Sequence, residues 1–145
     1  MPEHSTYDYA IVRVVPRVER GEFVNAGVIL SCADSGFLQA RIELDEAALL
    51  ALDPSVHLPG IRAALATIPI VCAGGPAAGA LGALSARERF HWLVAPRSTS
   101  VQTSAVHGGR CDDPEQTIEQ LLDSMVRHRK HPDPAGEAQP PATGA

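Results

Sequence analysis

Three runs of strand-forming residues follow one another closely near the N-terminus, and this pattern constrains the fold more than any other feature. The runs are Tyr7–Val15, Phe23–Cys32 and Phe37–Leu44, and they are rich in the β-branched and aromatic residues that strands favour. Pro16 ends the first run, and residues 33–36 (Ala-Asp-Ser-Gly) form a turn after the second. Because short links favour antiparallel neighbours, the sequence predicts a three-stranded antiparallel meander.

Beyond residue 44 the hydrophobic period changes to that of helices. Asp45 is placed to cap a short helix over Glu46–Leu52. The apolar spacing predicts a second helix within Leu58–Val71, which Pro69 ends or bends. The Gly- and Ala-rich segment 73–84 is interpreted as a flexible loop.

Two further helix starts flank one more predicted strand. A capping box at residues 85–88 precedes Phe90 and Trp92, and both rings are assigned to the core. The segment 98–107 alternates as a fourth strand. A cap followed by proline at 113–114 starts the last helix. Its apolar stripe, which predicts that this helix lies on the sheet, consists of Ile118, Leu121, Leu122, Met125 and Val126.

Together these elements predict one α+β domain over residues 1–131. We expect an antiparallel sheet of about four strands, the three-stranded meander plus the later strand, with helices packed on one face. The Pro-, Gly- and Ala-rich residues 132–145 are expected to form a disordered tail. The N-terminus lacks the segments of a signal peptide, and no apolar run approaches the roughly 18 residues that span a membrane. We therefore expect a cytoplasmic protein with no membrane partner.

The composition argues against two classes of function. The formal net charge of −5 disfavours nucleic acid as a partner, because nucleic-acid binders usually carry a basic face. Three scattered cysteines with no C-x-x-C pair do not form a disulfide framework.

Residues 107–112 (His-Gly-Gly-Arg-Cys-Asp) hold three potential zinc ligands. No second ligand pair accompanies them, so neither a metal nor a cofactor is assigned.

Polar residues within the predicted strands form the first candidate site. Strand alternation places Asn25 with Gly27 and Ile29, and neighbouring strands would bring Arg13, Asn25 and Arg41 to one face. Two guanidiniums beside an amide suit a phosphate or a carboxylate. The alternative is a solvated outer face on which arginine pairs with glutamate.

The turn between the first two strands also has two interpretations, a polar binding site or a surface ion pair. Gly21 supplies positive φ, whereas Arg20 and Glu22 either form a solubilising pair or rim a polar site. A strand-central Asn25 needs a hydrogen-bond partner, and we expect that partner to come from Arg20, Arg97 or the segment around His107.

Gly27 weakens a strand unless a bulge or a close neighbour requires it. Cys111 with His107 is either a thiolate pair or, as we favour, an unreactive buried cysteine with an unrelated histidine.

Arg97 and Ser98 follow Pro96 at a junction where loops often carry function. The ligand-binding candidates are Arg13, Arg20, Glu22, Asn25, Arg41, Arg97, Ser98, His107 and Asp112.

Three segments, in order, resemble the bacterial domain-of-unknown-function 3037 family. They are RVVPRVERGEFVNAGVIL, which begins at Arg13, SARERFHWLVAPRST from Ser85, and VHGGRCDDPE from Val106. With the last helix, the resemblance covers roughly residues 7–127. The family has no established activity, so the resemblance implies positions rather than chemistry: Arg13, Arg20, Glu22, Asn25, Gly27, Arg87, Arg97, Ser98, His107 and Asp112.

Similar proteins are often encoded beside a HipA-like kinase protein, which implies a partner or accessory role. Two hypotheses therefore stand. The first is a non-enzymatic binding module, a partner or regulator of such a kinase-like protein. The second is an enzyme or sensor that binds a phosphorylated small molecule or nucleic acid through Arg13, Arg20, Arg41, Arg97 and His107. No catalytic residues and no oligomeric state follow from the sequence. The two hypotheses differ in whether these side chains converge in one pocket.

Overall fold

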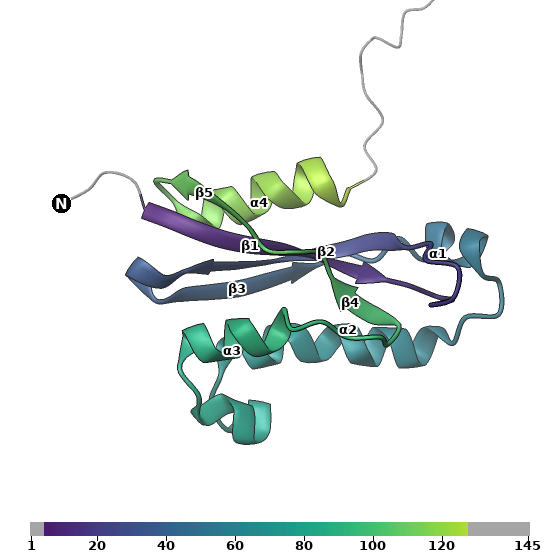
Figure 1. Cartoon of the computed structure of the whole chain (residues 1–145), viewed down its shortest axis with the longest axis horizontal. Coiled ribbons are helices and arrows are strands. Elements are labelled where there is room, and N and C mark those ends of the chain that lie inside the picture. The colour runs from purple at the N-terminus through teal and green to yellow at the C-terminus, as the bar shows by residue number, and fades with distance from the viewer. Residues whose placement is uncertain (1–4, 128–145) are drawn as a thin grey trace, which may run out of the picture.

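A computed structural model describes residues 5–127 and contains a five-stranded antiparallel sheet between two helical layers (Figure 1). The α+β class predicted from the sequence is confirmed. The strand order is β3-β2-β1-β4, and β5 also pairs with β1. The elements are β1 (Ser5–Val14), β2 (Val24–Cys32), η1 (Ala33–Ser35), β3 (Phe37–Ile42), α1 (Glu46–Leu52), α2 (Leu58–Ala73), η2 (Pro76–Ala83), α3 (Ala86–Leu93), β4 (Val101–Thr103), β5 (His107–Cys111) and α4 (Pro114–Met125).

The single later strand expected over 98–107 is two short strands on the same edge of β1. β4 pairs with Val12–Val14, and β5 pairs with Ser5–Tyr9. Ser104 bridges the break, because its N–H donates to the Ile11 carbonyl (2.8 Å) and its Oγ accepts from the Ile11 N–H (2.9 Å). A side-chain oxygen thus replaces a backbone acceptor where the edge strand changes course.

Helices cover both faces of the sheet, which differs from the expected packing on one face. Helices α2 and α3 lie below the sheet in Figure 1, and α4 lies above it. The cause is the central strands, whose apolar side chains alternate between the two faces and must be buried on both. The α2–α3 side holds Val12, Val14, Ala26, Ile29, Leu49, Ile61, Leu65, Ile68, Phe90 and Leu93, among others. The α4 side holds Ile11, Val28, Leu30, Cys32, Ile118, Leu122 and Val126.

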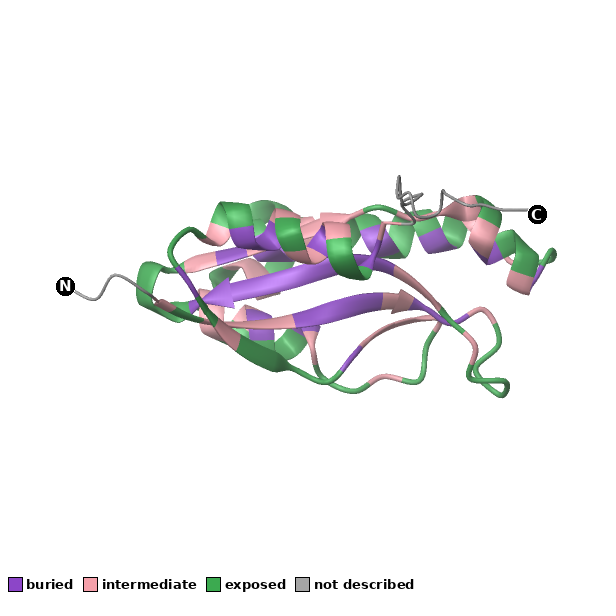
Figure 2. Ribbon diagram, turned by 90° about the horizontal axis from the view of Figure 1, so that it is seen from above, coloured by how far each residue is buried: buried purple, intermediate pink, exposed green. Residues whose placement is uncertain are grey.

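Buried residues accordingly concentrate along the strands and on the inward faces of the helices (Figure 2). Two core assignments were wrong. Phe90 is 1% exposed as expected, but Trp92 is 45% exposed and lies outside the core. Within the stripe of the last helix, Leu122 is buried whereas Met125 is 41% exposed, because the face that contacts the sheet is narrower than the stripe.

The predicted helix caps are present. The Asp45 side chain accepts from the Ala48 N–H (3.0 Å) at the start of α1, and Ser85 with Glu88 forms the reciprocal capping box of α3. Helix α2 continues through Pro69 and stops at Gly74.

The segment interpreted as a flexible loop instead folds into the short 3-10 turns of η2. Among the described residues, no single helix is long and apolar enough to cross a membrane. Only α2 and η2 counted together, across a 61° bend, reach that length and composition. The expected tail at 132–145 lies outside the described residues.

Candidate functional site

Arg13, Asn25 and Arg41 share the face of the sheet that α4 covers. Arg13 lies directly opposite Asn25 in the β1–β2 ladder, and Arg41 lies opposite Val28 of the α4-side core. The expectation that Asn25 shares a face with Ile29 was wrong. A β-bulge at Ala26 inserts one residue between the pairs Val12–Gly27 and Arg13–Asn25, and such an insertion resets the alternation.

The Arg41 guanidinium is neutralised by α4. It forms ion pairs with Glu115 (2.8 Å) and Glu119 (3.0 Å), and Gln39 donates to the same Glu115 carboxylate (3.1 Å). The arginine–glutamate pairing weighed as the alternative is therefore the observed arrangement, although a helix rather than open solvent covers the face.

Asn25 and Arg13 form the polar pair at the hairpin end of this face. The Asn25 amide donates to the Met125 carbonyl at the end of α4 (2.9 Å), so the partners expected from Arg20, Arg97 or the His107 segment were wrong. The Arg13 guanidinium lies 4.3 Å from the Phe23 ring centroid. Within residues 5–127 it makes no ion pair. Its Nε and the Asn25 Oδ1 are buried without a hydrogen-bond partner.

The remaining candidates are distributed over separate parts of the fold. Arg20 and Glu22 form an exposed bidentate pair in the turn, with both nitrogen–oxygen distances at 2.9 Å. Arg97 donates to the carbonyls of Leu93 and Trp92 (2.8 Å each) and stacks on the Trp92 ring at 4.5 Å. A cation at the carbonyl end of α3 suits the negative pole of that helix.

His107 is the first residue of β5 and pairs with Tyr9 of β1, and the two rings lie 5.7 Å apart. Ser98 and Asp112 are exposed. The structure therefore brings Arg13 and Asn25 together and places Arg41 on the same face, where α4 neutralises it. The other predicted residues lie apart, in the β1–β2 turn, in the loop after α3, and at the two ends of β5.

Arg87, which the family resemblance also singles out, ties α3 to the sheet. It donates to the Asp8 carboxylate (2.6 Å) and to the Ser31 hydroxyl (3.1 Å), and these two partners are neighbours in the β1–β2 ladder.

The cysteines and potential metal ligands form no reactive cluster in the described part of the chain. Cys32, Cys72 and Cys111 are free thiols and are buried. Burial raises the pKa of Cys72 to about 12. No group of three or more His, Cys, Asp or Glu side chains within residues 5–127 is arranged to hold a metal ion.

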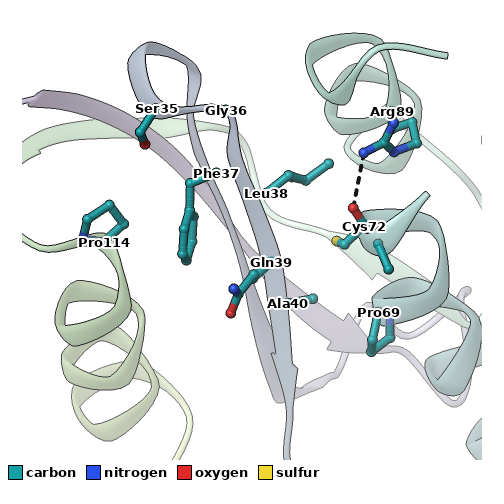
Figure 3. A pocket seen from close by; sticks show the side chains of 11 residues that line it. Ser35, Gly36, Phe37, Leu38, Gln39, Ala40, Pro69, Cys72, Arg89 and Pro114 are labelled. Atoms are coloured by element: carbon teal, nitrogen blue, oxygen red, sulfur yellow. Dashed lines mark hydrogen bonds between the residues drawn. The ribbon is translucent and has the colours of Figure 1, made fainter. Parts of the chain in front are cut away.

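Sequence reasoning missed the groove along the outer edge of β3 (Figure 3). The groove encloses about 780 Å³ and lies between α2 on one side and the start of α4 on the other. Strand β3 forms its floor, and no other strand within residues 5–127 pairs with that edge. The lining residues are Ser35, Gly36, Phe37, Leu38, Gln39, Ala40, Pro69, Cys72, Ala73, Arg89 and Pro114.

Backbone groups at the groove floor point outward. The Glu43 N–H donates to the Ala26 carbonyl (2.8 Å), and this pair continues the β2–β3 register. Hydrogen-bonded pairs alternate in an antiparallel ladder, so every second residue of β3 bonds to β2. The residues between them, Leu38, Ala40 and Ile42, direct their N–H and C=O groups away from β2, toward the unpaired edge.

The Arg89 side chain builds one end of the α2 wall. It donates to the carbonyls of Cys72 (3.2 Å) and Leu84 (2.5 Å), which fixes the end of α2 to the segment that follows it. Gly74 (φ 73°) leaves room for this guanidinium, since a Cβ there would lie 2.9 Å from the Arg89 Cζ. The groove wall is therefore held rigidly rather than formed by a loose loop.

A family model described as a protein of unknown function (DUF3037) matches residues 9–126. The comparison with curated proteins gave no match, and the comparison with solved structures gave none.

Proposed function

Because the chain belongs to the DUF3037 family, whose members are proteins of unknown function, we propose its role from the geometry: it is a binding module that accepts an extended segment of a partner protein at the β3 edge. The single observation that carries this proposal is the row of outward backbone groups at Leu38, Ala40 and Ile42, which lies at the floor of a groove between two helices. Strand addition to such an edge supplies main-chain hydrogen bonds, and pockets beside the edge supply specificity.

The walls of the groove suit an extended peptide. Pro69 and Ala73 present small apolar surface from α2, and Phe37 with Pro114 presents apolar surface on the α4 side. Side chains of an added strand would alternate between these two walls. Gln39 and Arg89 provide polar groups near them, so the groove offers both apolar contact and hydrogen bonds.

The partner in this proposal is the HipA-like kinase protein that the family resemblance implies, and the protein acts on it as a regulator without catalysing a reaction itself. Occupation of the groove by a kinase segment would hold the two proteins together through backbone pairing.

The test is calorimetric titration of the purified kinase-like neighbour with the full chain and with Ala40→Pro. Proline removes the outward N–H of Ala40, whereas the hydrogen bonds of β3 to β2 come from its neighbours, and edge strands tolerate such a proline. We expect Ala40→Pro to weaken binding by about tenfold or more, because central interface contacts dominate affinity. Unchanged affinity in a variant with a normal thermal unfolding curve would overturn the proposal.

A second variant tests the groove without altering the strand. Ala73→Arg places a long side chain in the groove, and Ala63→Arg makes the same change on the same helix at an exposed residue outside the lining. Binding should weaken in Ala73→Arg and remain at the wild-type level in Ala63→Arg. Equal effects of the two substitutions would contradict a groove-specific contact.

A second function, binding of a phosphate or carboxylate group, is supported by the Arg13 guanidinium. Arg13 makes no ion pair within residues 5–127, and its Nε is buried without a partner. An anion would satisfy this cation at low cost, because guanidinium offers a planar fork of donors. Titration with inorganic phosphate and with nucleotides should give heat that is lost in Arg13→Gln and that decreases as salt rises. Absence of heat with wild type at millimolar ligand would overturn this function.

A further inference from the structure

We infer that, without a kinase segment, the β3 groove is occupied by a second copy of this chain, with the two β3 strands paired antiparallel about a two-fold axis at Ala40. This inference rests on the proposed function, because both occupants would use the same edge. It names a self-association that would compete with the partner protein for the groove.

The backbone of β3 is self-complementary about Ala40. The outward-facing residues are Leu38, Ala40 and Ile42. A two-fold axis at Ala40 places each Ala40 opposite its counterpart and Leu38 opposite Ile42 of the other copy, so every outward group meets another outward group. An isologous interface requires this kind of self-matching, and the result is one continuous sheet of both copies.

Charges on the α4 side of the strand also match under this symmetry. The same axis places Arg41 of one copy opposite Gln39 of the other. Gln39 donates to Glu115 (3.1 Å) and Arg41 pairs with the same carboxylate (2.8 Å), so the Arg41–Glu115 pair of each copy would lie beside that of the other. Each copy thus contributes one cation and one anion to the interface, an arrangement that favours association with this register over a shifted one.

The α2 side of the groove presents one charge to a second copy, the Arg89 guanidinium, which is anchored on the Cys72 and Leu84 carbonyls. No acidic or basic residue occurs from residue 63 to residue 86, and the wall of the groove on this side is formed by Pro69 and Ala73 together with the anchored Arg89. The α2 residues of the wall, Pro69 and Ala73, therefore add no charge where two such walls face each other across the axis.

The β3 edge lacks the features that keep edge strands from pairing. Natural edges are blocked by proline, by lysine, or by a bulge. Strand β3 has the sequence FLQARI, which contains neither proline nor lysine, and its ladder with β2 runs without a register shift. The one charged residue, Arg41, is turned back to Glu115 and Glu119. An edge of this kind is suited to a strand-pairing partner.

The first arm of the test is sedimentation velocity of the full chain over a range of micromolar concentrations. Wild type should show a concentration-dependent dimer, Ala40→Pro and Ala73→Arg should sediment as monomers, and Ala63→Arg should behave as wild type. A wild type that remains monomeric throughout, or a dimer that persists in Ala40→Pro, would overturn the inference.

The second arm tests the register directly. The Cα atoms of directly opposed residues in a hydrogen-bonded antiparallel pair lie about 5.5 Å apart, which is within the range that a disulfide bridges. Ala40→Cys should therefore give a reducible covalent dimer on mild oxidation, and Ala63→Cys should not. Cross-linking of both variants to the same extent would contradict the two-fold axis at Ala40.

Comparison with the kinase titration separates the two proposals. A monomeric wild type whose kinase binding is lost in Ala73→Arg would overturn the dimer and keep the binding module. A dimer cross-linked through Ala40→Cys, combined with kinase binding that Ala40→Pro leaves unchanged, would overturn the binding module. Addition of kinase should dissociate the dimer, because both occupy the β3 edge, and a dimer that binds kinase without dissociating would contradict the shared groove.

Discussion

The Asn25 side-chain amide donates to the Met125 carbonyl at 2.9 Å, and this hydrogen bond joins the second residue of β2 to the last residue of α4. The C-terminal carbonyls of a helix have no intrahelical partner, so Asn25 caps α4 from the sheet. A residue that the sequence marks as a ligand candidate thus has a structural partner.

Substitution of Asn25 by alanine should destabilise the protein by about 1 kcal/mol, the usual net value of one hydrogen bond. Asn25→Asp should cost more, because a carboxylate would face the negative pole of α4. Urea unfolding gives both values, with the exposed Ser98→Ala as the control. Asn25→Asp more stable than Asn25→Ala would contradict the cap.

Gly27→Ala should be destabilising by about 1–3 kcal/mol, the range for overpacking. A Cβ at this position would lie 2.6 Å from the Arg41 carbonyl oxygen, and both groups belong to the paired strands β2 and β3. Gly21→Asn is the matched control, because a Cβ there meets nothing within 4 Å and asparagine tolerates positive φ. Thermal unfolding of both variants checks the difference; equal loss at the two glycines would refute the steric explanation.

Leu122→Ala should cost about 2–5 kcal/mol, because it leaves a cavity in the α4-side core. Leu122 is 1% exposed, whereas Met125 on the same helix is 41% exposed. Met125→Ala should therefore change stability by much less in the same denaturant series. A loss near zero for Leu122→Ala would mean that α4 does not pack on the sheet in solution.

The ion pair between Glu43 and Arg127 (2.6 Å) should make stability depend on acidic pH. The hydrogen bond from Arg127 lowers the pKa of Glu43, so the folded state holds this carboxylate ionised more strongly than the unfolded state does. The stabilisation is fully present above the unfolded pKa of about 4.3 and is lost as pH falls through the lower folded pKa.

The stability difference between wild type and Glu43→Gln should therefore be larger at neutral pH than near pH 3. Denaturant melts across this range measure it. In an Arg127→Gln background, the same Glu43 substitution should show much less pH dependence, and a dependence that persists there would assign the effect to another group.

Cys72 should react slowly with Ellman's reagent in the native protein, since burial raises its pKa to about 12 and the thiolate is the reactive form. The burial of Cys32 and Cys111 extends this expectation to all three thiols. Unfolding in urea should expose three reactive thiols. A fast native phase at mildly alkaline pH would show that at least one of them is accessible.

Local sequence signals predicted the local structure of the chain. The short turns led to the β1–β2–β3 meander, and the caps at Asp45 and Ser85 marked the starts of α1 and α3. These features depend on residues within one turn of the chain. The paired turn residues Arg20 and Glu22 follow the same rule, because each is within reach of the other along the backbone.

The errors arose where contacts between residues far apart in the sequence determine the structure. The bulge at Ala26 resets the face on which Asn25 lies, and one extra residue in a strand leaves no clear mark in a hydrophobic pattern. The layer to which α4 belongs depends on which face the other helices cover. The unpaired edge of β3 follows from the strand order, which no short segment encodes.

Val28 and Ile29 are consecutive in β2, both fully buried, yet Val28 packs on the α4 side and Ile29 on the α2–α3 side. Their methyl groups are therefore independent spectroscopic probes separated by one peptide bond. A chemical-shift change at Val28 alone reports an event at α4, and a change at Ile29 alone reports an event at α2 or α3. A simultaneous change at both reports that the strand itself has moved, as pairing at the neighbouring β3 edge would cause.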